Sequence, residues 1–217
     1  AVGVLAMPVL PFITDTDKNI AAFFQRLKYI GVDCVIPGWL TLRPGIQKET
    51  FFRVLDTHFN HLTGKYTELY KENRQSGNPL FWYRQEMEKR FFHYITMYKL
   101  NSLVPHYIYR NQLHNYDALH VLLQHMDALY KQRGINTKPL QAGYGNYMKW
   151  LTGEKREYNR RRSLKYTDLE LHLEEMARNG ELAHILGNKK LSVFVNKVIG
   201  EKLCFDYRTL QLYERVV

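Results

Sequence analysis

The sequence has little of what many cofactor-dependent enzymes need. Its two cysteines, Cys34 and Cys204, give neither a disulfide framework nor a metal-binding spacing. It contains no GxGxxG, P-loop, HExxH or GxSxG motif. No three cysteines cluster, so this chain by itself offers no iron–sulfur site. These absences exclude a self-contained catalytic site of those classes, and the low cysteine content is typical of a protein of the reducing cytoplasm.

Long apolar runs and an excess of acidic charge are missing as well. No stretch approaches the ~20 apolar residues that a membrane-spanning helix needs, and no signal peptide is visible. We therefore expect no membrane partner. The 31 Lys and Arg residues against 21 Asp and Glu give a formal net charge of +10. This charge favours acidic partners such as nucleic acid, although a basic protein without such a partner is the more common case.

The first 45 residues form the most informative stretch. Residues 2–10 are apolar nearly throughout, as in a strand that is covered on both faces. Residues 14–17 offer several helix caps, and apolar residues then recur at helical spacing as far as Gly31. Residues 32–36 read as a second buried strand, which Pro37-Gly38 is expected to break. A strand, a crossover helix and a parallel strand make one βαβ unit.

The chain after this unit reads as mainly helical. Residues 47–62 carry a phenylalanine-rich apolar stripe and are expected to form one helix that covers the sheet. Residues 72–78 are polar and contain glycine, which is typical of a linker. We therefore predict an α/β part over residues 1–72 and a mainly helical domain over residues 78–217.

Several elements are expected within this helical domain. Asn78-Pro79 should open a long helix, and residues 103–109 should be an extended connector. Residues 117–133 form the clearest helix of the chain. Residues 188–199 fit both a helix and a strand, and their caps favour the helix. Residues 209–215 fit either a last helix or an edge strand.

The ends of the two predicted strands carry the candidate ligand-binding residues. Loops at the carboxyl ends of parallel strands line the ligand crevice of an α/β sheet. Met7 and Pro8 lie at the first such end, and Trp39 and Arg43 lie at the second. Trp39 could stack on a base or simply pack. Arg43 could bind a carboxylate or phosphate in a bidentate manner, or it could be a solvated loop residue.

One dense basic run, residues 153–165, is the candidate nucleic-acid interface. Such a run can bind phosphates in a salt-dependent manner, and a solvated surface loop is the equal alternative. Tyr144, Tyr147 and Trp150 precede it and could form a stacking platform for bases, although inward packing is the commoner outcome. The candidate nucleic-acid-binding residues are Lys155, Arg156, Arg160, Arg161 and Arg162.

The opening stretch, continuing into the phenylalanine-rich helix, resembles the second half of the catalytic domain of radical S-adenosylmethionine proteins related to spore photoproduct lyase. In that family a strand ends in a Pro-x-x-Pro-x-x-(Thr/Asn)-Asp element. A helix, a glycine with a second strand, and a Leu-Arg pair with a nearby glycine follow in that order. The resemblance covers about the first 65 residues. The matching residues are Pro8, Pro11, Thr14, Asp15, Gly31, Leu42, Arg43 and Gly45.

This resemblance implies the C-terminal portion of a partial (β/α) barrel that holds a [4Fe-4S] cluster and S-adenosylmethionine in the intact protein. The cluster reductively cleaves S-adenosylmethionine to a 5′-deoxyadenosyl radical, which abstracts hydrogen from the substrate. The family carries its cluster cysteines in the first half of the domain, as Cys-x-x-x-Cys-x-x-Cys. This chain lacks that motif, either because the first half has been lost or because the chain is a relic. We favour loss, because the chain opens in the middle of a sheet.

The resemblance therefore implies a fragment of a bacterial, cytoplasmic, lyase-like enzyme whose substrate it leaves open. The fragment by itself should hold no cofactor or metal and should not turn over. Its residues would supply the far wall of the cofactor pocket. The candidate cofactor-binding residues on that wall are Met7, Pro8, Trp39, Leu42 and Arg43.

Two other functions stay open. The first is a non-enzymatic nucleic-acid-binding module that uses the basic run and the aromatics before it. The second is a helical protein-interaction domain attached to a catalytic half. A sheet that lacks its neighbouring strands would also expose a strand edge and an apolar patch, so we expect that the chain can associate with itself through that edge.

Overall fold

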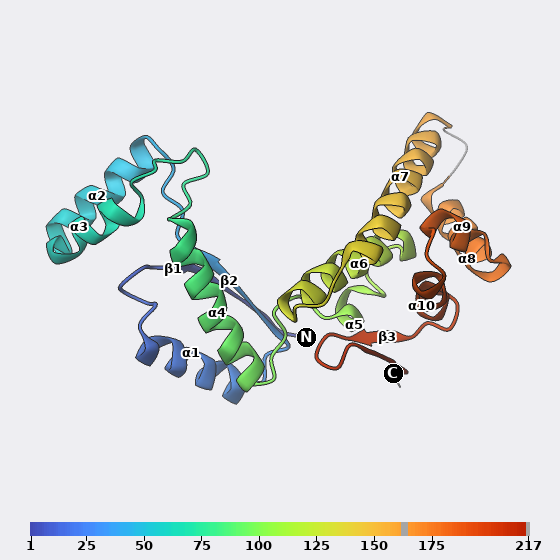
Figure 1. The fold of residues 1–217 in the computed structure, drawn as a ribbon, viewed down its shortest axis with the longest axis horizontal. Helices are drawn as coiled ribbons and strands as arrows, with labels where there is room; N and C mark the ends of the chain where they lie inside the picture. The colour runs from blue at the N-terminus through green and yellow to red at the C-terminus, as the bar shows by residue number, and fades with distance from the viewer. Residues whose placement is uncertain (162–164, 216–217) are drawn as a thin grey trace. The chain divides into compact units, whose positions relative to one another are not determined.

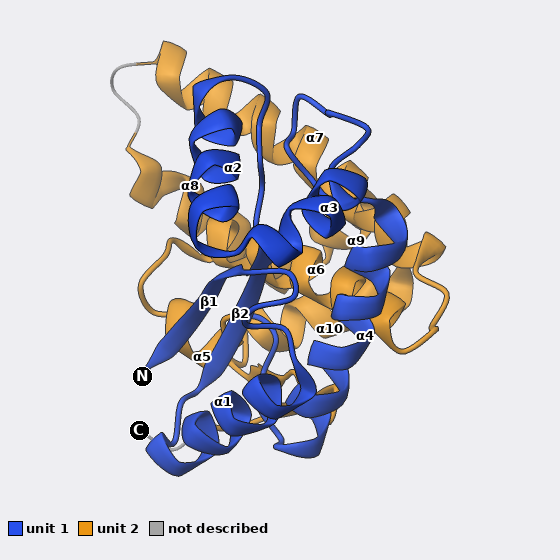
Figure 2. Cartoon of the chain, turned by 90° about the vertical axis from the view of Figure 1, so that its left-hand side faces the viewer, with its two compact units in different colours: residues 1–103 blue, residues 104–217 orange. Residues whose placement is uncertain are grey.

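The computed structural model describes residues 1–161 and 165–215, which divide into two compact units (Figure 1). Unit 1 covers Ala1–Leu103 and unit 2 covers Val104–Val217 (Figure 2). The fold is mixed α/β and mainly helical, as predicted. The boundary between the units differs from the predicted linker at residues 72–78, because the long helix that follows this linker packs into unit 1.

Unit 1 opens with the predicted βαβ unit. Strand β1 (Gly3–Val9) and strand β2 (Cys34–Trp39) pair in parallel, and helix α1 (Asp17–Ile30) connects them. The hydroxyl of Thr16 caps the first turn of α1, and Gly31 ends the helix in a left-handed conformation with φ 76°. The prediction of a parallel βαβ unit is confirmed.

Strand β2 continues beyond its expected end. It runs through Pro37 and Gly38 to Trp39, so the predicted break at these residues is wrong. The N–H of Val35 donates to the carbonyl of Asn101 (2.9 Å) on the edge of β2 that faces away from β1. Pro37 lies two residues further along, so its nitrogen faces the same edge. The missing N–H therefore costs the β1–β2 ladder nothing.

The predicted helix over residues 47–62 is two helices. Helix α2 (Ile46–His58) ends at Phe59, whose φ of −140° leaves the helical region, and helix α3 (Asn60–Leu69) begins directly after it. The break lets Leu55 of α2 and Leu62 of α3 enter one apolar cluster. The loops that follow β1 and β2 pack against that cluster.

Helix α4 (Phe81–Met97) closes unit 1. It begins later than the predicted start at Asn78-Pro79, because the N–H of Leu80 donates to the carbonyl of Leu69 (3.0 Å) and holds the preceding segment outside the helix. The C-terminal half of α4 packs with α1 through edge-to-face contact of Phe91 with Phe24. Its N-terminal half belongs to the cluster with α2 and α3.

The two faces of the β1–β2 sheet differ. Val4, Ala6 and Val35 pack into the core formed with α1 and α4. On the opposite face Leu5 is 67% exposed and Met7 is 50% exposed. The expectation that residues 2–10 are covered on both faces is therefore wrong for this structure. The helices of unit 1 cover one face of its sheet.

Unit 2 is mainly helical, as predicted. Residues 188–199 form the helix that the capping signals favour, with the side chain of Asn188 accepting from the N–H of Leu191 (3.1 Å). Residues 103–109 include a helical turn where an extended connector was expected, and residues 209–215 contain a strand. Its elements are α5 (His106–Tyr109), α6 (Asn115–Gln132), α7 (Lys138–Arg160), α8 (Tyr166–Asn179), α9 (Glu181–Leu186), α10 (Lys189–Ile199), β3 (Cys204–Asp206) and β4 (Gln211–Tyr213).

Strands β3 and β4 form an antiparallel hairpin at the end of unit 2, separate from the parallel sheet of unit 1. Every helix within residues 1–161 and 165–215 falls short of the length or the apolar character needed to cross a bilayer.

Candidate functional site

The loops that follow β1 and β2 lie side by side, because parallel strands end at the same edge of a sheet. Two tyrosines bind the backbone of these loops through hydrogen bonds from their hydroxyl groups. The hydroxyl of Tyr66 on α3 donates to the carbonyl of Pro11 (2.6 Å), and the hydroxyl of Tyr70 donates to the carbonyl of Leu40 (2.8 Å). Burial raises the pKa of Tyr66 and of Tyr70 above the usual range, so both hydroxyls stay protonated and remain donors.

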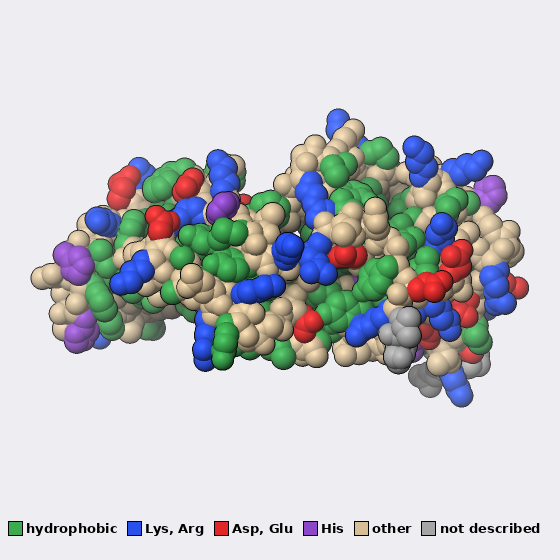
Figure 3. Space-filling model, turned by 90° about the horizontal axis from the view of Figure 1, so that it is seen from below, with side chains coloured by type: hydrophobic (Ala, Val, Ile, Leu, Met, Phe, Trp, Pro, Cys, Tyr) green, Lys and Arg blue, Asp and Glu red, His purple; other side chains and the backbone are tan. Residues whose placement is uncertain are grey.

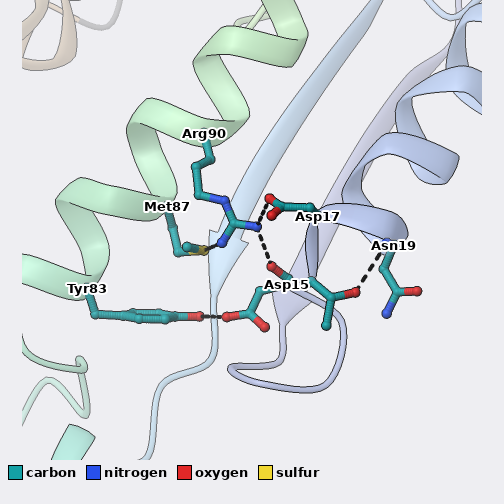
Figure 4. A network of polar contacts seen from close by, with 7 residues as sticks. Asp15, Asp17, Asn19, Tyr83, Met87 and Arg90 are labelled. Carbon is teal, nitrogen blue, oxygen red and sulfur yellow. Dashed lines mark hydrogen bonds and ion pairs between the residues drawn. The ribbon is translucent and has the colours of Figure 1, made fainter.

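A second set of contacts joins the β1 loop to helix α4 (Figure 4). The hydroxyl of Tyr83 donates to Oδ2 of Asp15 (2.8 Å). The guanidinium of Arg90 donates to the carbonyl of Asp15 (2.8 Å) and to Oδ1 of Asp17 (2.6 Å), and it touches the sulfur of Met87 (3.5 Å). Burial and the bond to Asp15 raise the pKa of Tyr83 above the usual range. The loop is thus tied to α4 by one phenol and one guanidinium.

The role of Asp15 differs from the one that its sequence position suggests. Asp15 and Asp17 both read as helix-capping residues, but Thr16 is the residue that caps α1. Asp15 is only 6% exposed and is the one buried carboxylate among the described residues. A buried carboxylate is stable only with donors at close range. Asp15 therefore fixes the shape of the loop after β1 through its partners on α4.

Met7 and Pro8 lie at the end of β1, where the sequence places them. Met7 lies across β2 at Gly38, where an added Cβ would approach the sulfur of Met7 to 2.9 Å. Pro8 is exposed. Both residues border a cavity of about 260 Å³, which is mostly apolar. Its other lining residues are Ala6, Val9, Thr14, Asn19, Ile20, Phe23 and Phe91.

Trp39, Leu42 and Arg43 have three different environments. Trp39 is half-buried and packs edge-to-face on Phe91, with ring centroids 5.3 Å apart, so its packing role is the one observed. The side chain of Leu42 is buried in the core. Its backbone N–H donates to the carbonyl of Gly77 (2.7 Å). Arg43 is exposed next to it. Of these three side chains, that of Arg43 is the most open to a charged ligand.

Sequence reasoning missed the contribution of α4 to this face. An open groove of about 790 Å³ runs from Asp15 to α4, where Trp82 lies 58% exposed. Tyr83 and Arg90 reach the loop because residues seven apart share one face of a helix. That spacing of a phenol and a guanidinium was the available signal in the sequence. The site is therefore built from α3 and α4 as well as from the strand ends.

The basic run lies in helix α7 as far as Arg160, where a loop was one of the expectations. The ammonium of Lys155 pairs with Asp117 (2.6 Å) and lies over the ring of Tyr116 at 4.9 Å from the centroid. Lys155 therefore contributes to packing within unit 2. Arg156 is exposed on the same helix.

The positive charge at the end of the basic run is partly neutralised by an acidic side chain. Arg160 and Arg161 both pair with Glu157, at 3.1 Å and 2.6 Å. Both arginine side chains remain well exposed, at 75% and 61%. Arg162 lies outside the described residues. On the face drawn in Figure 3, Lys and Arg side chains are scattered among neutral and acidic ones and form no continuous patch.

The aromatic residues of α7 pack inward, as the commoner outcome predicted. Tyr147 is fully buried, and its hydroxyl donates to the carbonyl of Tyr116 (2.8 Å). Tyr144 stacks on His120, and the hydroxyl of Tyr144 lies 3.1 Å from Nδ1 of His120. Trp150 packs against Tyr147. These rings are engaged in the core of unit 2 and do not form a platform for bases.

Unit 2 also holds a buried polar cluster that the sequence did not reveal. The phenol of Tyr207 lies 2.7 Å from that of Tyr109 and 2.8 Å from Nδ1 of His125. The N–H of Phe205 donates to Nδ1 of His106 (3.1 Å). Burial lowers the pKa of His106 and that of His125 to about 4, so both rings are neutral near pH 7. The cluster anchors β3 to helices α5 and α6.

The cysteines cannot hold an iron–sulfur cluster by themselves. Cys34 is buried in β2, and burial raises the pKa of its thiol. Cys204 is buried in β3 of the other unit, where the guanidinium of Arg110 lies 3.1 Å from its sulfur. A cluster held by three thiolates therefore needs cysteines from outside residues 1–217.

Comparison with known proteins identifies no relative. No family model matches the chain, and no curated protein and no solved structure matches it. The functional argument therefore depends on the geometry described above and on the resemblance of the opening stretch.

Proposed function

We propose that unit 1 is part of a partial (β/α) barrel of a radical S-adenosylmethionine enzyme. The observation that carries the proposal is the parallel β1–β2 pair whose helices cover one face only. In a (β/α) barrel the helices pack on the outside, and the opposite face of each strand lines the interior. Leu5 and Met7 lie on that interior face in this assignment.

The loops at the carboxyl ends of the strands support the same proposal. Active sites of (β/α) barrels lie at the carboxyl ends of the strands. Here the two loops are held by donors from Tyr66, Tyr70, Tyr83 and Arg90, which fixes their backbone before any ligand arrives. Such preorganisation is what a binding face requires.

The chain fits S-adenosylmethionine in part and does not fit the cluster. Arg43 is exposed beside the buried Leu42 and would bind the carboxylate of the methionine moiety. Met7 and Pro8 would form the apolar wall against which this ligand rests. The cluster would be held by cysteines that residues 1–217 do not contain. The contribution of this chain is therefore to bind and orient the ligand.

The test uses the longest gene product that contains residues 1–217. The protein is reconstituted with iron and sulfide without oxygen and is reduced with dithionite in the presence of S-adenosylmethionine. We expect 5′-deoxyadenosine by mass spectrometry, reduced strongly by Arg43→Ala. Arg53→Ala is the matched control, because Arg53 is exposed on α2, and this change should have no effect. A reconstituted protein with bound cluster that forms no 5′-deoxyadenosine contradicts the proposal.

A nucleic-acid-binding role is a second candidate, supported by the exposure of Arg160 and Arg161. A phosphate can compete with Glu157 for these guanidinium groups because they are open to solvent. Binding of single-stranded RNA should fall steeply with salt, and alanine at both arginines should reduce the slope of log K against log salt by about 1.4. Binding that is absent at low salt, or a slope that the double variant leaves unchanged, rejects this role.

A further inference from the structure

Helix α7 of unit 2 carries an exposed face on which four cationic side chains are aligned. At about 100° per residue, the four fall within an arc of about 40° around this 23-residue helix. They are spread over about 33 Å of the helix axis, and each residue is exposed. We call this surface the cationic face of α7. Its cations are Lys138, Lys149, Arg156 and Arg160.

Most of the charge on this face has no acidic partner. Within residues 1–161 and 165–215, Lys138, Lys149 and Arg156 form no ion pair, unlike the cations at the end of the basic run. The two glutamates of α7, Glu154 and Glu157, lie outside the arc that holds the cations. Charge complementarity therefore favours an acidic occupant for this face.

Two glycines that border the same arc add a second constraint on the occupant. Glycine weakens the interior of a helix, so it needs a reason there. Gly143 has one, because an added Cβ would lie 2.6 Å from the side chain of Leu191 on α10. Gly145 and Gly153 lie between the cations, and no described atom lies within 4 Å of a Cβ added at either position. A partner whose backbone approaches α7 closely would explain both glycines.

The spacing along this face is that of a seam between two helices. Successive residues of the seam are separated by alternate steps of four and three, which is the heptad spacing at which helices pack along their length. The small residues allow a second backbone to come close, and the long cationic side chains can reach the flanks of a helix that lies there. The seam consists of Lys138, Ala142, Gly145, Lys149, Thr152 and Arg156.

Two other acidic occupants fit this face less well. Lysine and arginine side chains reach a phosphate backbone without glycine beside them, so nucleic acid leaves Gly145 and Gly153 unexplained. The aromatic rings of α7 pack inward, so they offer unpaired bases no platform. Helices that bind anionic membranes also present a broad apolar face, whereas Ala142 is the one apolar side chain of this seam.

We propose that the cationic face of α7 is a docking surface for an acidic α-helix of a partner protein. The partner helix carries glutamate or aspartate at steps of four and three residues, and its backbone rests on Gly145 and Gly153. Carboxylates opposite Lys149 and Arg156 set the register of the two helices. This surface belongs to unit 2, so the inference does not depend on the enzymatic function proposed for unit 1.

The test measures peptide binding to the longest gene product that contains residues 1–217. The probe is a fluorescent, alanine-rich helical peptide whose glutamates lie along one face at steps of four and three residues. A peptide of the same composition with its glutamates scattered around the helix is the control. We expect the patterned peptide to bind several-fold more tightly by fluorescence anisotropy at low salt. Equal binding of the two peptides, or no binding of either, overturns the proposal.

Charge variants test whether the peptide binds at this face. Lys149→Gln together with Arg156→Gln should weaken binding of the patterned peptide about tenfold, because each exposed ion pair contributes a few-fold. Lys190→Gln together with Lys197→Gln is the matched control, because it removes the same charge from exposed positions on α10. Equal losses for the two double variants would show attraction by net charge alone and overturn the proposed face.

A glycine variant separates a helix from nucleic acid. Gly153→Gln keeps the charge and places its side chain in open space, so the fold should be retained. Peptide binding should fall several-fold because the new side chain separates the two backbones, whereas Gly64→Gln in α3 should have no effect. Peptide binding that Gly153→Gln leaves unchanged overturns the close contact. RNA that binds more tightly than the peptide, and that only the charge variants weaken, identifies nucleic acid as the occupant and overturns the proposal.

Discussion

Replacing Tyr83 by phenylalanine tests the buried contact that ties the β1 loop to α4. The substitution removes the hydroxyl that donates to Asp15 at 2.8 Å and leaves the ring in place. Asp15 is 6% exposed, so water cannot fully replace the lost donor. A hydrogen bond to a charged group contributes about 1.5–3 kcal/mol. We therefore expect Tyr83→Phe to lower the free energy of unfolding of unit 1 by about 2 kcal/mol.

The assay is urea unfolding followed by circular dichroism, with hydrogen exchange to localise the effect. Exchange should accelerate in the loop after β1 and in the first turns of α4. Tyr29→Phe is the matched control, because Tyr29 is 81% exposed and should change stability by less than about 0.5 kcal/mol.

A double-mutant cycle gives the refuting result. In the Asp15→Asn background the acceptor is neutral, so Tyr83→Phe should cost only about 1 kcal/mol. Equal costs in the two backgrounds would show that the charge of Asp15 plays no part. A stability loss no larger than that of Tyr29→Phe would refute the reasoning as a whole.

Two further predictions concern a buried histidine and a close backbone contact. Burial lowers the pKa of His106 from 6.5 to about 4, so the unfolded chain takes up this proton first. The contribution of His106 to stability should be complete above pH 6.5 and fall towards pH 4 by at most about 3 kcal/mol, and the similarly buried His125 adds a contribution of its own. His106→Gln should remove only the His106 share of the pH dependence in urea titrations, whereas the exposed His184→Gln should leave the pH dependence as it is. Gly77→Ala should cost at least about 2 kcal/mol, because Gly77 has φ +70° and its added Cβ would lie 2.6 Å from the backbone nitrogen of Arg43. Gly64→Ala in α3 meets open space and should stabilise by about 0.5–1 kcal/mol, so equal effects of the two substitutions in thermal unfolding would contradict this reading.

The local signals in the sequence predicted the βαβ unit at the start of unit 1. The apolar run of β1, a cap among residues 14–17 and the stop at Gly31 were all readable, because each acts within a few residues, whereas the choice of Thr16 among the possible caps was not. The break at Phe59 was not readable. It arises because Leu55 and Leu62 must enter one cluster, and this is a tertiary requirement.

The candidate site was predictable only in part. Met7, Pro8 and Arg43 lie at strand ends, which the βαβ pattern identifies. The partners of Asp15 come from a helix about seventy residues further on, and no local pattern links them. In the same way, the pairing of Lys155 with Asp117 joins two helices of unit 2, so the basic run looked more available for phosphate than it is.

The central claim is that these residues belong to a radical S-adenosylmethionine enzyme whose cluster ligands precede them. Sequencing the coding DNA on the 5′ side of the codon for Ala1 tests it most directly. We predict an open reading frame that encodes Cys-x-x-x-Cys-x-x-Cys within ~150 residues, somewhat over half of a typical barrel. A reading frame of that length without the three cysteines would contradict the claim.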